Sequence, residues 1–266
     1  MIVLQAPPSL AILLISLLRN ASAELSSGLL LSRDSTGNTA LHFCAGNGTG
    51  DSYSVMDALI KAAPRALTFQ NAEGDTPLHL AASNPTSSVD CISLLLEAYP
   101  EATLLQDCSG ATPLHAAIAN KASGAVIQKL LSVAPKMASV VDNDGLLPLH
   151  YVGAFLHTDI DSVKKIITIY PSAVIDQSKE GDVPLHTAVV NSNDEIDEDG
   201  LRILELLVTD SNGVEPILMT NKEHVSWRFV IFQFDVYFRE VEYHLLTIAD
   251  SFLFTLVESS PLLCHL

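Results

Sequence analysis

The chain has 266 residues, with 31 Asp and Glu against 14 Lys and Arg, and a formal net charge of −17. This balance argues against a protein that binds the phosphate backbone of nucleic acids, because such binding needs clustered cations. The cysteines, Cys44, Cys91, Cys108 and Cys264, form no C-x-x-C pair, so they indicate neither a zinc site nor a disulfide framework. We expect buried or half-buried thiols in a reducing compartment.

The first strongly apolar run covers residues 9–18. It is too short to span a bilayer, which takes about 20 residues. It could be the apolar part of a signal peptide with a cleavage site at Ala21-Ser22-Ala23, and the protein would then be secreted without residues 1–23. A signal peptide has basic residues before its apolar run, but no Lys or Arg precedes this run, and Arg19 follows it. We favour an apolar cap or incomplete repeat over residues 1–29 of a cytoplasmic protein.

A histidine then recurs within Thr-Pro-Leu-His or a close variant of it, at spacings of 37, 36, 35 and 36 residues. The five histidines are His42, His79, His115, His150 and His186. A fixed period of this size indicates a stacked-repeat protein, in which each repeat buries its apolar face against its neighbours. Function in such proteins is normally found on the surface that the stack creates.

Each histidine follows a four-residue segment such as Asn71-Ala72-Glu73-Gly74. Asp, Asn or Ser at the first position and Gly at the fourth favour a type I turn, which predicts a tight finger before every histidine. Thr76 can cap the next helix, and Pro77 suits its first position. Leu147 and Val183 replace this threonine in the fourth and fifth repeats. A lost cap costs about 1 kcal/mol, so we expect those repeats to be less stable unless packing compensates.

A second helix is predicted in each repeat from apolar residues at i, i+3 and i+4, which share one helical face. The five sets are Met56/Leu59/Ile60, Ile92/Leu95/Leu96, Ile127/Leu130/Leu131, Val163/Ile166/Ile167 and Ile203/Leu206/Leu207. A proline follows four of these helices and should end them. These prolines are Pro64, Pro100, Pro135 and Pro171.

Over about residues 30–210 the chain resembles the ankyrin repeat family. The resemblance lies in the order of the predicted elements, which is finger, Thr-Pro-Leu-His, short helix, loop and second helix. Residues 74–82 and 110–118 lie closest to the family pattern. The resemblance implies an all-α fold, an ankyrin-repeat solenoid of stacked helix-turn-helix units with short β-turn fingers. The domain at 30–213 would hold repeats near 34–70, 71–106, 107–141, 142–177 and 178–213.

These repeats are longer than the family length of about 33 residues, and we place the additions in the loops at 46–54 and 191–200. The second loop contains an acidic run that could bind a basic partner. We favour the simpler interpretation of a solvated insertion. The run comprises Asp194, Glu195, Asp197, Glu198 and Asp199.

Residues 214–266 form an atypical tail, in which aromatic residues concentrate and Thr-Pro-Leu-His does not recur. Asn221-Lys222-Glu223 resembles a sixth finger, but His224 stands where glycine is expected. One interpretation is a C-terminal cap, with a strand-like segment at 225–238 and an amphipathic helix at 245–257. The other is that the reading frame leaves the coding sequence near residue 224, for example through a retained intron. Sequencing the transcript across this codon distinguishes them.

The recurring histidines cannot share a metal ion, because stacked repeats lie about 10 Å apart and zinc–nitrogen bonds are near 2 Å. In the ankyrin family the matching histidine ties one repeat to the backbone of the next. His157, His224, His244 and His265 follow no such pattern. No phosphate-binding loop or catalytic signature occurs, so we expect no metal, no cofactor and no enzymatic activity.

The resemblance implies a non-catalytic interaction module, a scaffold or adaptor that holds a protein partner on the concave face. That face would be formed by the finger tips Asn71, Glu73, Asp107, Ser109, Asn143, Asp144, Lys179 and Glu180 and by the first-helix residues Phe43, Leu80, Ala116 and Tyr151. Phe43 and Tyr151 are the predicted aromatic anchors. The alternative is the ankyrin segment of a larger enzyme, signalling or channel protein. We expect a monomer that binds protein, with no nucleic acid and no membrane span.

Overall fold

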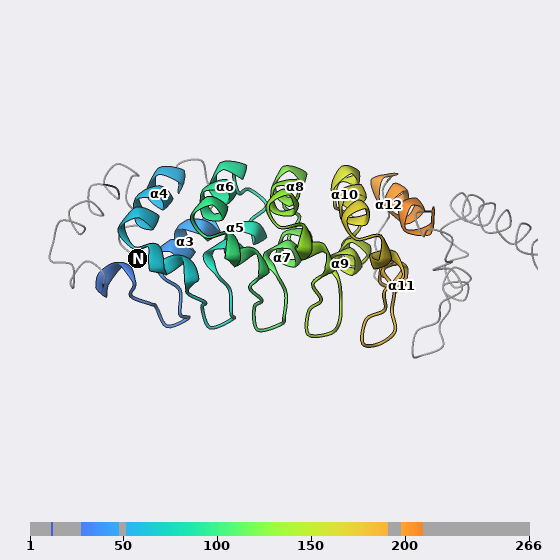
Figure 1. Cartoon of the computed structure of the whole chain (residues 1–266), viewed down its shortest axis with the longest axis horizontal. Helices are drawn as coiled ribbons and strands as arrows, with labels where there is room; N and C mark the ends of the chain where they lie inside the picture. The colour runs from blue at the N-terminus through green and yellow to red at the C-terminus, as the bar shows by residue number, and fades with distance from the viewer. Residues whose placement is uncertain (1–11, 13–27, 48–51, 191–197, 210–266) are drawn as a thin grey trace, which may run out of the picture.

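The structure is a computed structural model that describes residue 12 and residues 28–47, 52–190 and 198–209 (Figure 1). Within these residues the protein is all-α, as predicted. The tail at 214–266 with its sixth-finger segment, the run Asp194–Asp197, the proposed cleavage site and Cys264 lie outside the described residues. Of the apolar run at 9–18 only Ile12 is described, and it packs against the core.

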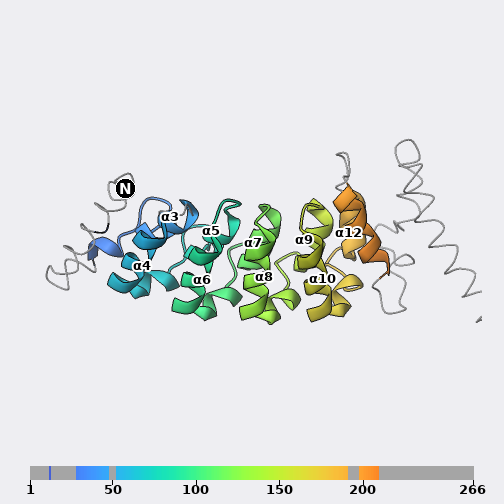
Figure 2. The ribbon, with the colours of Figure 1, turned by 90° about the horizontal axis from the view of Figure 1, so that it is seen from above.

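Helices alternate in two rows along the long axis of the molecule (Figures 1 and 2). The first helices are α3 (Ala40–Asn47), α5 (Pro77–Ser83), α7 (Pro113–Ala119), α9 (Pro148–Phe155) and α11 (Pro184–Val190). The second helices are α4 (Ser52–Ala62), α6 (Val89–Ala98), α8 (Gly124–Val133), α10 (Ile160–Ile169) and α12 (Glu198–Thr209). The fingers project together from the edge formed by the first helices (Figure 1).

The first helices begin where the sequence predicts. α5 has Pro77 at its first position, and the Thr76 hydroxyl accepts the backbone N–H of His79 at 3.4 Å. In the second helices, Ser88 and Asp159 take the same capping role through side-chain oxygens that accept the N–H of Asp90 and Ser162. Capping side chains therefore mark the starts of α5, α6 and α10, and α5 also begins with a proline.

The second helices end just before the predicted prolines, and each proline then starts a short 3-10 helix that the sequence analysis did not foresee. These are η2 (Pro64–Thr68), η3 (Pro100–Leu104), η4 (Pro135–Ser139) and η5 (Pro171–Val174). The 3-10 helices bury small side chains such as Ala66 and Ala102. They lead the chain from the end of one repeat to the next finger.

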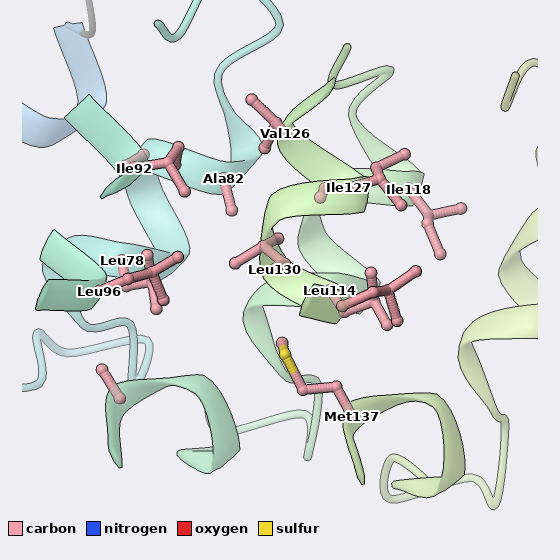
Figure 3. Packing of buried hydrophobic residues seen from close by; sticks show 14 of the residues in the cluster. Leu78, Ala82, Ile92, Leu96, Leu114, Ile118, Val126, Ile127, Leu130 and Met137 are labelled. Carbon is pink, nitrogen blue, oxygen red and sulfur yellow. The ribbon is translucent and has the colours of Figure 1, made fainter. Parts of the chain in front are cut away.

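One apolar core runs through the stack between the two rows of helices. Leu114 is fully buried, as are Ile127 and Leu130 from the predicted second-helix stripe (Figure 3). The predicted stripes are buried in α4, α6, α8 and α10, whereas in α12 Leu206 is half-buried and Leu204 joins Ile203 and Leu207 in the core. Because each repeat packs on its neighbours, the core positions the surface residues of successive repeats in a regular series.

Candidate functional site

Each finger is closed by a side-chain oxygen of its first residue. In the second finger Asn71 Oδ1 accepts the backbone N–H of Glu73 at 3.0 Å and of Asp75 at 2.9 Å. The same pair of bonds is made by Asp34, Asp107, Asp142 and Ser178 in the other fingers. Gly74, the fourth residue, has φ +83°, which a residue with a side chain rarely adopts. The predicted tight turns are confirmed, and their first side chain serves the turn itself.

Neighbouring fingers are joined through their backbones. The N–H of the second finger residue donates to the carbonyl oxygen of the third residue in the preceding finger. The bonds are Ala72 to Thr36 (2.8 Å), Cys108 to Glu73, Asn143 to Ser109 and Lys179 to Asp144 (each 2.9 Å). A Cβ atom on Gly74 would lie 2.5 Å from the Cys108 nitrogen, so glycine also permits this close approach. The finger tips are thus held in a fixed row.

Glutamine side chains, which the sequence analysis missed, add a second link. Gln70 Nε2 donates to the Gly74 oxygen at 2.8 Å and to the Gln106 oxygen of the next repeat at 2.9 Å. Gln106 repeats the pattern, bonding Gly110 and Val141. Gln70, Gln106 and Gln177 each stand directly before a finger, and this recurrence is the signal that could have revealed them.

The recurring histidines bridge adjacent repeats. His79 Nδ1 accepts the backbone N–H of Thr76 at 3.2 Å, and its Nε2 lies 3.2 Å from the Ala111 carbonyl oxygen of the next repeat. The other bridges run from Nε2 of His42 to Asp75 (3.1 Å), of His115 to Leu146 (3.2 Å) and of His150 to Asp182 (2.9 Å). The structural role implied by the resemblance is therefore observed. Both ring nitrogens are occupied in these bridges, so none is offered to a metal.

This geometry requires a neutral ring, because Nδ1 must stay unprotonated to accept an N–H. Burial lowers the pKa of His115 to about 4, and lowers the pKa of His42, His79 and His150 as well. His186 repeats the Nδ1 bond with Val183, but its buried Nε2 has no partner among the described residues. No group of His, Cys, Asp and Glu that could hold a metal was found in the described part of the chain.

The predicted binding residues lie on one side of the molecule, at the fingers and first helices (Figure 1). Of the predicted finger residues, six are exposed: Glu73, Ser109, Asn143, Asp144, Lys179 and Glu180. Asn71 and Asp107 are half-buried, with their side chains used in the turns. Phe43, Leu80, Ala116 and Tyr151, each directly after a histidine, are half-buried on successive first helices.

Tyr151 is held by contacts within the protein. Its hydroxyl donates to Asp142 Oδ2 at 2.8 Å, and its ring meets the His115 ring edge-on at 5.0 Å. Burial and this carboxylate raise the pKa of the Tyr151 hydroxyl. One turn along α9, Phe155 is 47% exposed, and its ring centroid lies 6.3 Å from that of Tyr151. The sequence analysis missed Phe155, which the i, i+4 spacing from Tyr151 could have indicated.

His157, for which the sequence offered no partner, also links two repeats. Its Nε2 lies 2.7 Å from the Ile118 carbonyl oxygen, and its ring centroid lies 5.6 Å from that of Phe155. Leu156 before it has φ +47°, which turns the chain so that His157 can reach the preceding repeat. Phe155 is therefore supported on both sides, by Tyr151 and by His157.

The prediction of buried or half-buried cysteines was wrong for Cys108, which is exposed because it is the second residue of a finger turn. Cys44 and Cys91 are buried and free, and burial, with the nearby Cys91, raises the pKa of Cys44 to about 12. Within the described residues, no helix has the length and apolar character needed to span a membrane.

Residues 49–132 match the family model described as "Ankyrin repeats (3 copies)". The matched segment runs from the second helix of the first repeat through α8, and contains the second and third fingers. No curated protein matches the chain.

Proposed function

The chain belongs to the ankyrin-repeat family, and we propose that it is a non-catalytic module that binds a protein partner across its finger tips and first helices. Ankyrin repeats are generally protein–protein interaction modules. The partner surface of this chain would comprise the exposed tips Glu73, Ser109 and Asp144 and the first-helix residues Tyr151 and Phe155. It would act as a scaffold or adaptor.

The observation that carries this proposal is the fixed row of fingers. Backbone bonds between fingers and histidine bridges behind them hold successive tips in one register. A surface that is rigid before binding loses little conformational entropy when a partner docks. The second helices, by contrast, present mixed charges, with the ion pair of Lys61 and Asp57 as an example.

A matched pair of charge reversals tests which side binds. Glu73→Arg changes an exposed finger tip, and Glu97→Arg makes the same change on the exposed side of α6. The full chain and both variants would be used to capture partners from cells, with the amounts compared by mass spectrometry. We expect Glu73→Arg to lose partners that wild type and Glu97→Arg retain. Partners lost with Glu97→Arg and kept with Glu73→Arg would contradict the proposal.

A further inference from the structure

The three central fingers are uniformly acidic. Residues 70–75, 106–111 and 141–146 contain no Lys, Arg or His. Their carboxylates are Glu73, Asp75, Asp107, Asp142 and Asp144. The ion pairs found among the described residues lie instead on second helices, in α4 and α12. None of these ion pairs includes a carboxylate of the central fingers, although Lys179 of the fifth finger donates its Nζ to the Asn143 carbonyl oxygen beside Asp144.

These carboxylates act on one another across the fingers. Burial raises the pKa of Asp75, and the charges of Asp107 and Glu73 raise it further. The negative charges of Asp142, Asp107 and Asp144 also contribute to the raised pKa of Tyr151. Neighbouring negative charges destabilise each other, so a cation placed among them would be stabilised.

The acidic fingers continue directly into an exposed aromatic surface. Tyr151 connects the two, because its hydroxyl bonds Asp142 while its ring faces Phe155. We name Asp107, Asp142, Asp144, Tyr151 and Phe155 the α9 strip. At the finger end of α9, Asp144 is exposed, whereas Asp142 is buried and bonds its own turn and Tyr151. Asp107 is half-buried in the neighbouring finger, and Phe155 is 47% exposed at the other end of α9.

We propose that the α9 strip binds a segment of a protein partner in which Lys or Arg lies close to an apolar side chain. The proposal rests on the function proposed above and names the chemistry of the partner. The cation pairs with the carboxylates of Asp144 and Asp107, and the apolar side chain covers Phe155. A helix the length of α9 spans about 12 Å, so in an extended segment the two side chains stand about three to five residues apart.

Other occupants fit the strip less well. A polynucleotide would bring phosphates toward the acidic fingers of a chain with net charge −17. A second copy of the chain would bring its own net charge of −17 against the strip. An acidic peptide would meet the same repulsion, which makes it a useful comparison in the test.

The test selects peptides from a random phage-displayed library on the immobilised full-length chain at physiological salt. We expect selected peptides to carry Lys or Arg and an apolar residue at the stated spacing. Phe155→Ala should weaken their binding about fivefold or more, equivalent to about 1 kcal/mol. The double variant Asp107→Asn/Asp144→Asn should weaken it similarly. This double variant keeps the finger intact, because Asn71 already makes the turn bonds of Asp107 in the second finger.

Matched controls separate this site from general attraction to an acidic protein. Glu97→Gln/Glu101→Gln removes the same charge from exposed positions of α6 and η3, and Tyr53→Ala removes an aromatic ring that is 43% exposed on α4. Neither should change peptide affinity by more than about twofold, within the range of screened surface effects. Unchanged melting temperatures would show that all variants fold.

Selection of acidic or uncharged peptides, failure to select any peptide, or equal losses in the variants and their controls would overturn the inference. The proposed function could survive this outcome. If a captured partner depends on Glu73 but ignores Phe155→Ala and Asp107→Asn/Asp144→Asn, the finger face binds protein and the α9 strip does not.

Discussion

The second and third repeats differ from the fourth and fifth at the residue before the first helix. Thr76 and Thr112 place hydroxyl oxygens 2.8 and 2.9 Å from Nδ1 of His79 and His115. Leu147 and Val183 have no hydroxyl, yet their backbone N–H groups still donate to the histidine Nδ1 at 3.0 and 3.1 Å. The histidine bridge therefore depends on the backbone amide, and the threonine hydroxyl is an addition to it.

Packing replaces the hydroxyl in the later repeats. Leu147 is 2% exposed and Val183 is fully buried. α9 and α11 also approach closely at Gly153, where an added Cβ would lie 2.3 Å from the Pro184 carbonyl oxygen. Thr187 on α11 donates its hydroxyl to the His150 carbonyl oxygen at 3.0 Å. These contacts are the packing that can compensate the fourth and fifth repeats for the missing threonine cap.

The largest expected effect is the loss of folding stability at acidic pH. It tests whether the histidine bridge stabilises repeats with and without the threonine to the same extent. Folding lowers the pKa of His115 from 6.5 to about 4, so its stabilising contribution is complete above pH 6.5 and is lost as the pH falls toward 4. This pKa shift corresponds to a change of about 3 kcal/mol in the free energy of unfolding for one histidine. Urea unfolding at pH 7 and near pH 4 measures the loss.

Glutamine substitution identifies the groups responsible, since glutamine does not titrate. His115→Gln and His150→Gln should each reduce the difference in unfolding free energy between the two pH values, although only the first has a threonine beside it. An undiminished pH dependence in both variants would show that other groups control acid stability.

The next effect concerns the contact between α9 and α11. Gly153→Ala should cost about 1–3 kcal/mol, because its methyl group collides with backbone that cannot rotate away. Gly46→Ala in α3 is the matched control, since its nearest neighbour would be 3.7 Å away and alanine favours a helix. Thermal unfolding of both variants measures the effect. Equal melting temperatures would mean that α9 and α11 do not pack more closely at Gly153 than the chain packs around Gly46.

The smallest effect is that of the threonine hydroxyl. Thr112→Val should cost about 1 kcal/mol, the usual contribution of one hydrogen bond, because the backbone N–H bond to His115 remains. Thr168→Val on the exposed side of α10 should change the unfolding free energy by less than about 0.5 kcal/mol. A cost of several kcal/mol at position 112 would show that the hydroxyl, and not the amide, maintains the bridge.

The sequence predicts those parts of the fold that depend on local chemistry. Finger turns, helix starts at Pro77 and Pro113, and the buried stripe around Leu130 follow from residue type and spacing. The links between repeats are harder to predict, because they join residues far apart in the chain. His157 bonds a carbonyl oxygen 39 residues away, and only the turn at Leu156 brings it there.

The family resemblance implies a binding surface on the fingers and first helices, and this surface remains a proposal. The sequence does not show which finger residues have exposed side chains. Asn71 and Asp107 are used by their turns, whereas Glu73 and Asp144 are exposed. The exposure of Phe155 depends on how Tyr151 and His157 pack around it, which residue spacing alone does not determine.

Photo-crosslinking tests the proposed binding surface most directly. A benzophenone amino acid would replace Ser109, at the tip of the third finger, or Ser132, exposed on α8 of the same repeat. Both full-length proteins would be irradiated with a captured partner. A crosslink from position 109 and none from position 132 is the predicted result. A crosslink from position 132 alone would contradict binding by the fingers and first helices.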